Sequence, residues 1–162
     1  MSFDNIDKRF EYVRAGASWK QLDTNVKVIK SMFAKGHHGG IHAVYNLYNC
    51  TRLCELKEYA NSVGHSILWQ TLFQPEWLDP SLFNSKVRQL AVDEINKLMN
   101  DFNLDPQEEN FFNLVKDNMT NKISSDRDIA TEFWKQTEKL ETVYHPNKES
   151  FRDLWPELAA VI

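Results

Sequence analysis

A short, almost uncharged stretch at residues 39–49 constrains the fold of this chain more than any other feature. It is rich in β-branched and aromatic residues and lies between two segments with helical periodicity, which is typical of a buried strand in a β/α unit. We expect this strand at about 41–48. A second mostly apolar run, at 66–73, follows after one helix-length segment. Strands separated by a helix cannot form a hairpin, so the two runs predict parallel neighbours with a right-handed crossover.

Helical periodicity covers most of the remaining chain, and start and stop signals bound several of its segments. Asn84 breaks one long segment, and Asp105 with Glu108 forms a capping box at the start of the next. Gly64 follows the last periodic residue of an earlier segment, where a left-handed residue ends many helices. Residues 4–16 predict an ordered loop with a short helical piece. The predicted helices lie at about 18–35, 51–63, 80–102, from 106, from 125 and at 150–155.

These elements predict a helix-rich α/β chain in two parts. Residues 1–79 would contribute two or three parallel strands with their helices, and residues 80–162 a helical region that packs on them. So few strands bury too little surface to form a stable parallel sheet, whose faces and edges both need cover. Either the later helices cover the open edge, or the chain dimerises, or it is the C-terminal part of a larger barrel. Residues 1–4 resemble the end of a strand, which favours the last alternative.

The composition argues against several classes of protein. The chain has 162 residues, of which 42% are hydrophobic, enough for one domain with a core, and its formal charge of −4 argues against a general nucleic-acid binder. Its longest wholly apolar run has five residues, at 158–162, which is too short for a transmembrane helix. A polar N-terminus and only two cysteines make the reducing cytoplasm the expected location.

Four motifs, in order along the chain, point to a family. The segments at 2–5 and 9–19 resemble the fourth-strand region of radical SAM enzymes of the twitch/SPASM type, although Asn5 stands where that family usually has glycine. The segment at 46–49, followed by Leu53 and Glu55, is similar to their fifth strand. The segments at 74–78 and 151–158 resemble, respectively, the stretch after their sixth strand and their C-terminal close.

The resemblance implies a partial (β/α)6 barrel in which a [4Fe–4S] cluster binds and reductively cleaves S-adenosylmethionine. In the family a Cys-x3-Cys-x2-Cys loop after the first strand holds that cluster. Cys50 and Cys54 have the first spacing, but position 57 is lysine and both cysteines follow the fifth strand. The resemblance therefore implies the C-terminal part of a truncated or split enzyme, which is not catalytic alone. Its partner would be an N-terminal half with the cluster, and its substrate is unknown, with a peptide as one candidate.

Within that resemblance, five residues near strand ends are candidate cofactor-binding groups. Ser2 and Asp4 match the position beside the ribose and amino-acid part of S-adenosylmethionine. Asn46 and Asn49 carry both donors and acceptors and suit an adenosine or ribose edge. Gln70, near the end of the next strand, is a third such amide. The alternatives are a frayed N-terminus for the first pair and, for Asn49, a cap on the following helix.

Other residues carry weaker signals. Tyr12 and Arg14 either hold substrate at the barrel mouth or pack on the surface. His37, His38 and His42 are interrupted by a pair of glycines, so we expect a solvated loop instead of a metal site. The rival interpretation of the whole chain is non-enzymatic: a small α-rich interaction module that forms a homodimer or binds a protein partner.

Overall fold

A two-stranded parallel sheet lies at the centre of the computed structural model, which describes residues 1–32, 40–121, 128–145 and 149–162. Strand β1 (Gly40–Tyr45) pairs in parallel with β2 (Ser66–Thr71), in a register that places Val44 opposite Gln70. On the other side of β1, Ser2 forms a parallel bridge with His42. The prediction of parallel neighbours is confirmed, and β1 lies between β2 and the bridging residue Ser2.

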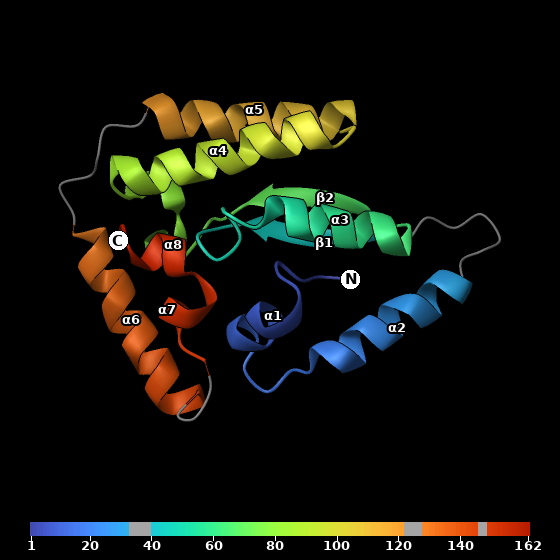
Figure 1. The fold of residues 1–162 in the computed structure, drawn as a ribbon, viewed down its shortest axis with the longest axis horizontal. Coiled ribbons are helices and arrows are strands. Elements are labelled where there is room, and N and C mark those ends of the chain that lie inside the picture. The colour runs from blue at the N-terminus through green and yellow to red at the C-terminus, as the bar shows by residue number, and fades with distance from the viewer. Residues whose placement is uncertain (33–39, 122–127, 146–148) are drawn as a thin grey trace.

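Helices surround this sheet on several sides (Figure 1). Helix α3 lies over the strands, α4 and α5 run side by side along one side of them, and α6 to α8 gather near the C-terminus. Two single-turn 3₁₀ helices, η1 (Glu76–Leu78) and η2 (Pro80–Leu82), link β2 to α4. The α-helices are α1 (Asp7–Val13), α2 (Trp19–Met32), α3 (Leu53–Val63), α4 (Ser85–Asp101), α5 (Pro106–Asn121), α6 (Ile129–Tyr144), α7 (Phe151–Leu154) and α8 (Pro156–Ala159).

Local capping explains where several of these helices begin and end. The Asn84 side chain accepts the N–H groups of Lys86 and Val87, so the predicted break in the long helical segment is confirmed. Asp105 accepts the N–H of Glu108, and the Glu108 carboxylate accepts the N–H of Asp105, which is the predicted capping box. These signals depend only on neighbours along the chain, and the sequence therefore shows them.

Several details of the elements differ from the prediction. The first strand ends at Tyr45 because Asn46 begins a turn, and α3 starts at Leu53, two residues later than expected. Pro156 begins the short helix α8, since proline suits a first helical turn as well as it stops a preceding one. His42 lies within β1, so its assignment to a loop was wrong. His37, His38 and the helix start predicted at Ser125 lie outside the described residues.

The two faces of the sheet differ sharply in burial. We call one the covered face, because its side chains are buried, and the other the open face, because its side chains are half-buried or exposed. Alternation along each strand produces this division, since successive side chains point to opposite sides. The covered face carries Ile41, Ala43, Tyr45, Ile67 and Trp69, and the open face carries Ser2, Gly40, His42, Val44, Ser66, Leu68 and Gln70.

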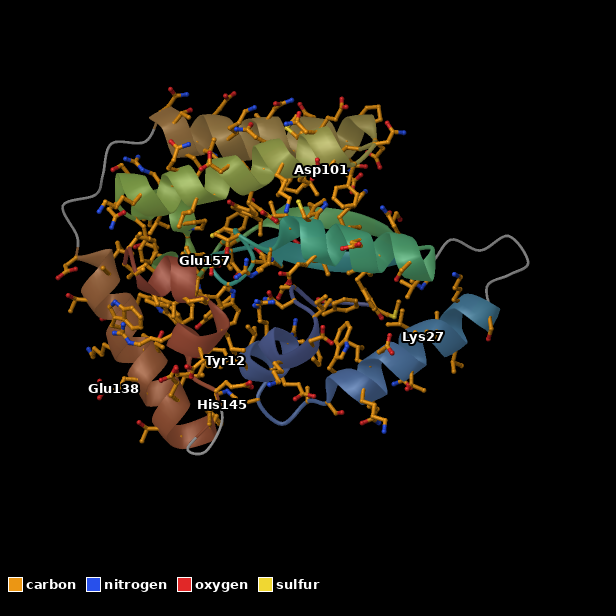
Figure 2. The ribbon with its side chains drawn as sticks, in the orientation of Figure 1. Tyr12, Lys27, Asp101, Glu138, His145 and Glu157 are labelled. Carbon is orange, nitrogen blue, oxygen red and sulfur yellow. The ribbon has the colours of Figure 1, made fainter. Side chains whose placement is uncertain are left out.

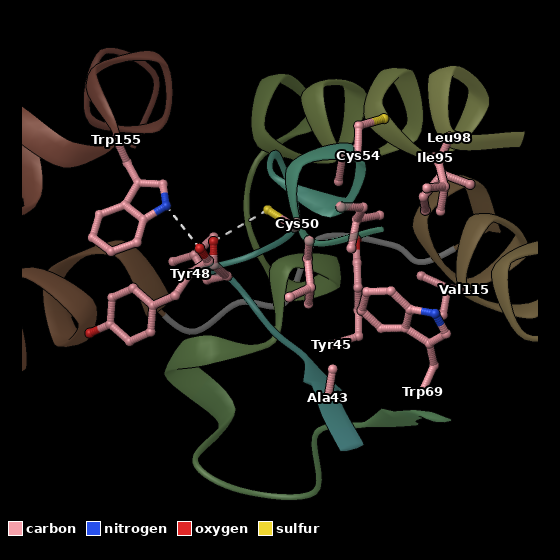
Figure 3. Packing of buried hydrophobic residues seen from close by; sticks show 14 of the residues in the cluster. Ala43, Tyr45, Tyr48, Cys50, Cys54, Trp69, Ile95, Leu98, Val115 and Trp155 are labelled. Atoms are coloured by element: carbon pink, nitrogen blue, oxygen red, sulfur yellow. Dashed lines mark hydrogen bonds between the residues drawn. The ribbon is translucent and has the colours of Figure 1, made fainter. Parts of the chain in front are cut away.

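One hydrophobic cluster joins both predicted parts of the chain. Figure 3 shows Tyr45 and Trp69 from the strands packed near Leu98 and Val115 from α4 and α5. At the other end of the cluster, the fully buried indole of Trp155 donates to the carbonyl oxygen of Tyr48 at 2.8 Å. The helices after residue 80 therefore share their core with the strands, and the predicted boundary near residue 79 does not separate two cores.

A buried ion pair ties α3 to α5. Lys57 Nζ lies 2.6 Å from both carboxylate oxygens of Glu108, and the side chains of both residues are less than a tenth exposed. The indole N–H of Trp69 also donates to Glu108, at 3.4 Å. Burial of a charge is tolerated only where it is paired and hydrogen-bonded, and both conditions are met here. In the described ranges, no helix has both the length and the apolar character of a membrane-spanning segment.

Candidate functional site

The carboxyl end of β1 is closed by the side chain of Asp4. His42 exchanges backbone hydrogen bonds with Met1 and Phe3, and the next N–H along the strand, that of Val44, donates to Asp4 Oδ1 at 2.7 Å. Residues 1–3 pair with β1 through their backbone, and the Asp4 carboxylate then takes the place of a backbone acceptor for the next N–H of β1. Asp4 is fixed at a strand end, where folds of parallel strands place their functional groups.

Asn46 and Asn49, which follow β1 along the chain, also bond to the backbone at this strand end. Both side-chain amides donate to the carbonyl oxygen of Val44, each at 2.8 Å, and Asn49 also donates to the carbonyl oxygen of Asp4 at 3.3 Å. Their side-chain oxygens accept the N–H groups of Tyr48 and Asn46. Neither asparagine caps α3, whose N-cap is Arg52 without a side-chain bond, so the capping alternative for Asn49 was wrong.

The structure thus brings three of the five candidate residues into one hydrogen-bond network. Asp4, Asn46 and Asn49 meet around Val44, and the two asparagines are buried with most of their donors and acceptors used by the backbone. Ser2 and Gln70 lie outside this network, on the open face, where both are exposed. The network shapes the strand end, and the open face presents the groups that a ligand could reach.

Two residues that the sequence interpretation undervalued join the open face. His42 stands opposite Ser2 on one side and Leu68 on the other. Arg14, half-exposed after α1, brings its guanidinium within 3.7 Å of Asp4 Oδ2. The signal for His42 was available, because it is two residues before Val44 in the strand and therefore shares its face. Arg14 gave no such signal, since its approach to Asp4 depends on how α1 turns back toward the sheet.

The electrostatics of Asp4 follow from its partial burial. Burial raises the pKa of the Asp4 carboxyl above its ordinary value, and the Val44 N–H, Arg14 and His42 each oppose that rise. A carboxylate held this way, with one oxygen bound to the backbone and the other beside a guanidinium, can accept from hydroxyl or ammonium groups of a small polar ligand. His42 and Gln70 would supply further donors and acceptors on the same face.

Tyr12 has a different environment from the one that a substrate-binding role requires. It is buried, its hydroxyl donates to Glu141 at 3.0 Å, and its ring stacks on His145 with the two centroids 4.9 Å apart. Figure 2 shows Tyr12 and His145 side by side where α1 meets α6. The His145 ring also donates to the carbonyl oxygen of Tyr12 at 2.9 Å. These contacts attach α1 to α6.

The two cysteines do not fit an iron–sulfur cluster. Cys50 is fully buried, its thiol donates to the carbonyl oxygen of Leu47 at 3.4 Å, and burial raises its pKa strongly (Figure 3). Burial, together with Glu94, raises the pKa of Cys54 to about 12. A cluster requires several accessible thiolates. Across the described residues, no group of three or more histidine, cysteine or acidic side chains could hold a metal ion.

Comparison with known proteins gives no identification. The chain matches no protein-family model, and neither a curated protein nor a solved structure is detectably similar to it.

Proposed function

We propose that this chain is the C-terminal part of a radical SAM enzyme of the twitch/SPASM type. It would complete the S-adenosylmethionine pocket and the substrate entrance of an N-terminal polypeptide that carries the cluster, and would not be catalytic alone. The observation that best supports this proposal is the open face of the sheet, which places polar groups beside a fixed carboxylate at the strand ends.

The incompletely covered sheet supports the idea that a second polypeptide completes the fold. Parallel sheets in proteins are covered on both faces, but Leu68 is 53% exposed on the open face. Neither the outer edge of the first segment nor that of β2 pairs with another described strand. A sheet with one bare face and two unpaired edges is what a slice of a larger barrel would present.

The proposal assigns distinct roles to the five candidate residues. Ser2, Asp4 and Gln70 would accept from and donate to the polar groups of S-adenosylmethionine. Asn46 and Asn49 would act as positioning residues, because their amides hold the end of β1 and leave little capacity for a ligand. Reductive cleavage of S-adenosylmethionine at a cluster in the N-terminal polypeptide would supply the radical, and the residues of this chain would only bind and orient.

Anaerobic co-expression tests the proposal. The chain is produced with a tagged N-terminal half of a twitch/SPASM enzyme that carries the Cys-x3-Cys-x2-Cys loop, and we expect an iron-containing complex to co-purify. Gln70→Trp, on the open face, should reduce recovery of the complex at least tenfold. Gln21→Trp is the matched control, because Gln21 is exposed on α2 and is not part of the sheet. If no iron-bound complex forms and the chain alone is a stable monomer, the proposal fails.

A second candidate function is the non-enzymatic interaction module, and one observation favours it. The unpaired edge of β2 is accompanied by exposed Leu68, Phe73 and Leu114, which is more apolar surface than an edge strand usually shows. Sedimentation of the chain alone separates the two ideas, since a homodimer module would self-associate and the fragment of an enzyme would await its complement.

A further inference from the structure

A groove runs between the outer edge of β2 and the first half of α5. Its volume is about 210 Å³. Three consecutive β2 residues line one wall, so the backbone of the strand edge, and not only alternate side chains, must face the groove. The lining residues are Ile67, Leu68, Trp69, Asp105, Gln107, Glu108, Asn110, Phe111 and Leu114.

The backbone of this edge is available for pairing. Within the described ranges, the backbone hydrogen bonds of β2 are those that it makes with β1. In a parallel pair, half of the N–H and C=O groups of each strand point away from the partner, so β2 presents a row of such groups to the groove. A groove with a strand edge as its wall suits an extended chain more than a compact ligand.

Large apolar side chains make up part of the groove lining. Trp69 and Phe111 line the groove, with their ring centroids 6.4 Å apart and their planes nearly parallel. Leu68 and Leu114 also line the groove and are 53% and 58% exposed. A large aliphatic side chain that entered the groove would remove the exposed parts of Leu68 and Leu114 from water, which favours binding.

The charges at the groove are acidic. Asp105 is exposed in its lining, Glu109 is exposed in the same first turn of α5, and Glu108 is neutralised by Lys57. In the part of the chain that the structure describes, no lysine or arginine lines the groove. The N-terminus of α5 contributes only about half of a positive charge. Lysine or arginine beside the docked strand is therefore favoured. A second copy is disfavoured, because it would bring like carboxylates together between chains that each carry −4.

We propose that β2 binds an extended, basic peptide segment of a partner protein as an added strand. The peptide backbone would pair with the outer edge of β2, one aliphatic side chain would enter the groove between Leu68 and Leu114, and a flanking lysine or arginine would lie near Asp105. Main-chain pairing would supply affinity, and the apolar side chains that line the groove would supply specificity, as in other strand-addition complexes. This inference concerns the outer edge of β2 and is tested on the isolated chain, so its failure is distinguishable from failure of the enzymatic proposal.

Fluorescence anisotropy tests this inference on the intact chain. The probe is a short labelled peptide in which valine and threonine alternate around a central leucine, with lysine at both ends. We expect saturable binding that Leu114→Glu weakens at least tenfold. Val28→Glu is the matched control, because Val28 is similarly exposed, at 51%, on α2 and outside the groove, and it should leave binding unchanged.

Two further probes separate strand addition from other modes of binding. The same peptide with alternate backbone amides N-methylated should not bind, since it cannot pair with an edge, and one with glutamate in place of lysine should bind more weakly at low salt. Equal binding of the N-methylated peptide would overturn the inference. So would a dimer of the chain, seen by sedimentation, that Leu114→Glu dissociates, because a second copy would then occupy the groove.

Discussion

The covered and open faces of one small sheet are made by alternate residues of the same two strands, yet they differ sharply in burial. On the covered face, Ile41 and Ala43 are completely buried against the helices. On the open face, their neighbours His42 and Val44 are only half-buried, and Leu68 of β2 is mainly exposed. The difference arises from strand parity alone, because both faces belong to the same two strands in the same register.

This contrast indicates that the two faces contribute unequally to the stability of the chain. The covered face and its helices bury the apolar side chains on which the free energy of unfolding depends. The open face carries Ser2, His42 and Gln70, which stabilise the isolated chain little and suit contacts with something outside it. The contrast can be tested by substitutions on each side, taken from the largest expected effect to the smallest.

The largest effect is expected from the buried ion pair on the covered side. Lys57→Met should lower the free energy of unfolding by about 3–5 kcal/mol, because it leaves the carboxylate of Glu108 buried without its cation. Urea denaturation followed by circular dichroism measures the loss. The double variant Lys57→Met with Glu108→Gln should recover most of it, since no charge then remains buried. Equal losses in the single and double variants would show that packing, and not charge, is at stake.

A matched pair of truncations tests the two faces directly. Ile41→Ala should cost about 2–5 kcal/mol, because Ile41 is fully buried and the cavity cannot fill. Leu68→Ala, opposite His42 on the open face, should change the free energy of unfolding by less than about 0.5 kcal/mol. Both values come from the same urea titration. Similar costs at the two positions would remove the distinction between the faces.

The strand end offers a second matched pair. Asn49→Ala should destabilise the fold by about 1–3 kcal/mol, because the N–H of Asn46 and the carbonyl oxygen of Val44 lose a buried partner. Gln70→Ala should leave the thermal midpoint nearly unchanged, since Gln70 is exposed. A stable Asn49→Ala variant would mean that the asparagine is free for a ligand after all, and that its role as a positioning residue is wrong.

The smallest effect concerns pH. Burial raises the pKa of Asp4 in the folded chain, so its contribution to stability is present below the ordinary carboxyl pKa of about 3.9 and is lost as pH rises through the raised value. Relative to Asp4→Asn, which retains an acceptor for the Val44 N–H, the wild-type chain should gain stability as pH falls from 7 toward 4. Chemical denaturation at several pH values measures this difference. A difference that shrinks on acidification would contradict the expected sign.

Much of the fold was predictable because its signals are local. The strands around Val44 and Gln70 have the composition of buried β-structure, and the caps at Asn84 and Asp105 act within three residues of themselves. The end of β1 was not predictable with the same accuracy. The run from Tyr45 to Tyr48 remains apolar and aromatic apart from Asn46, and only the hydrogen bonds of Asn46 and Asn49 turn the chain away.

The site was predictable in position more than in detail. Asp4, Asn46 and Asn49 do meet at a strand end, as parallel strands require, but their mutual bonds depend on the return of residues 46–49 toward the first segment. The Lys57–Glu108 pair joins residues 51 positions apart, and charged residues of helices are usually exposed, so no local pattern shows it. Long-range pairing of this kind is set by tertiary packing.

The hydrogen bond from Val44 to Asp4 also gives the molecule an internal reporter. An amide proton bound to a carboxylate is more deshielded than one bound to a neutral oxygen, so the resonance of Val44 should follow the ionisation of Asp4. The Val44 amide belongs to β1, where exchange of its proton with solvent requires the local structure to open. One backbone signal in an NMR spectrum would thus report whether Asp4 is ionised or protonated, without an added probe.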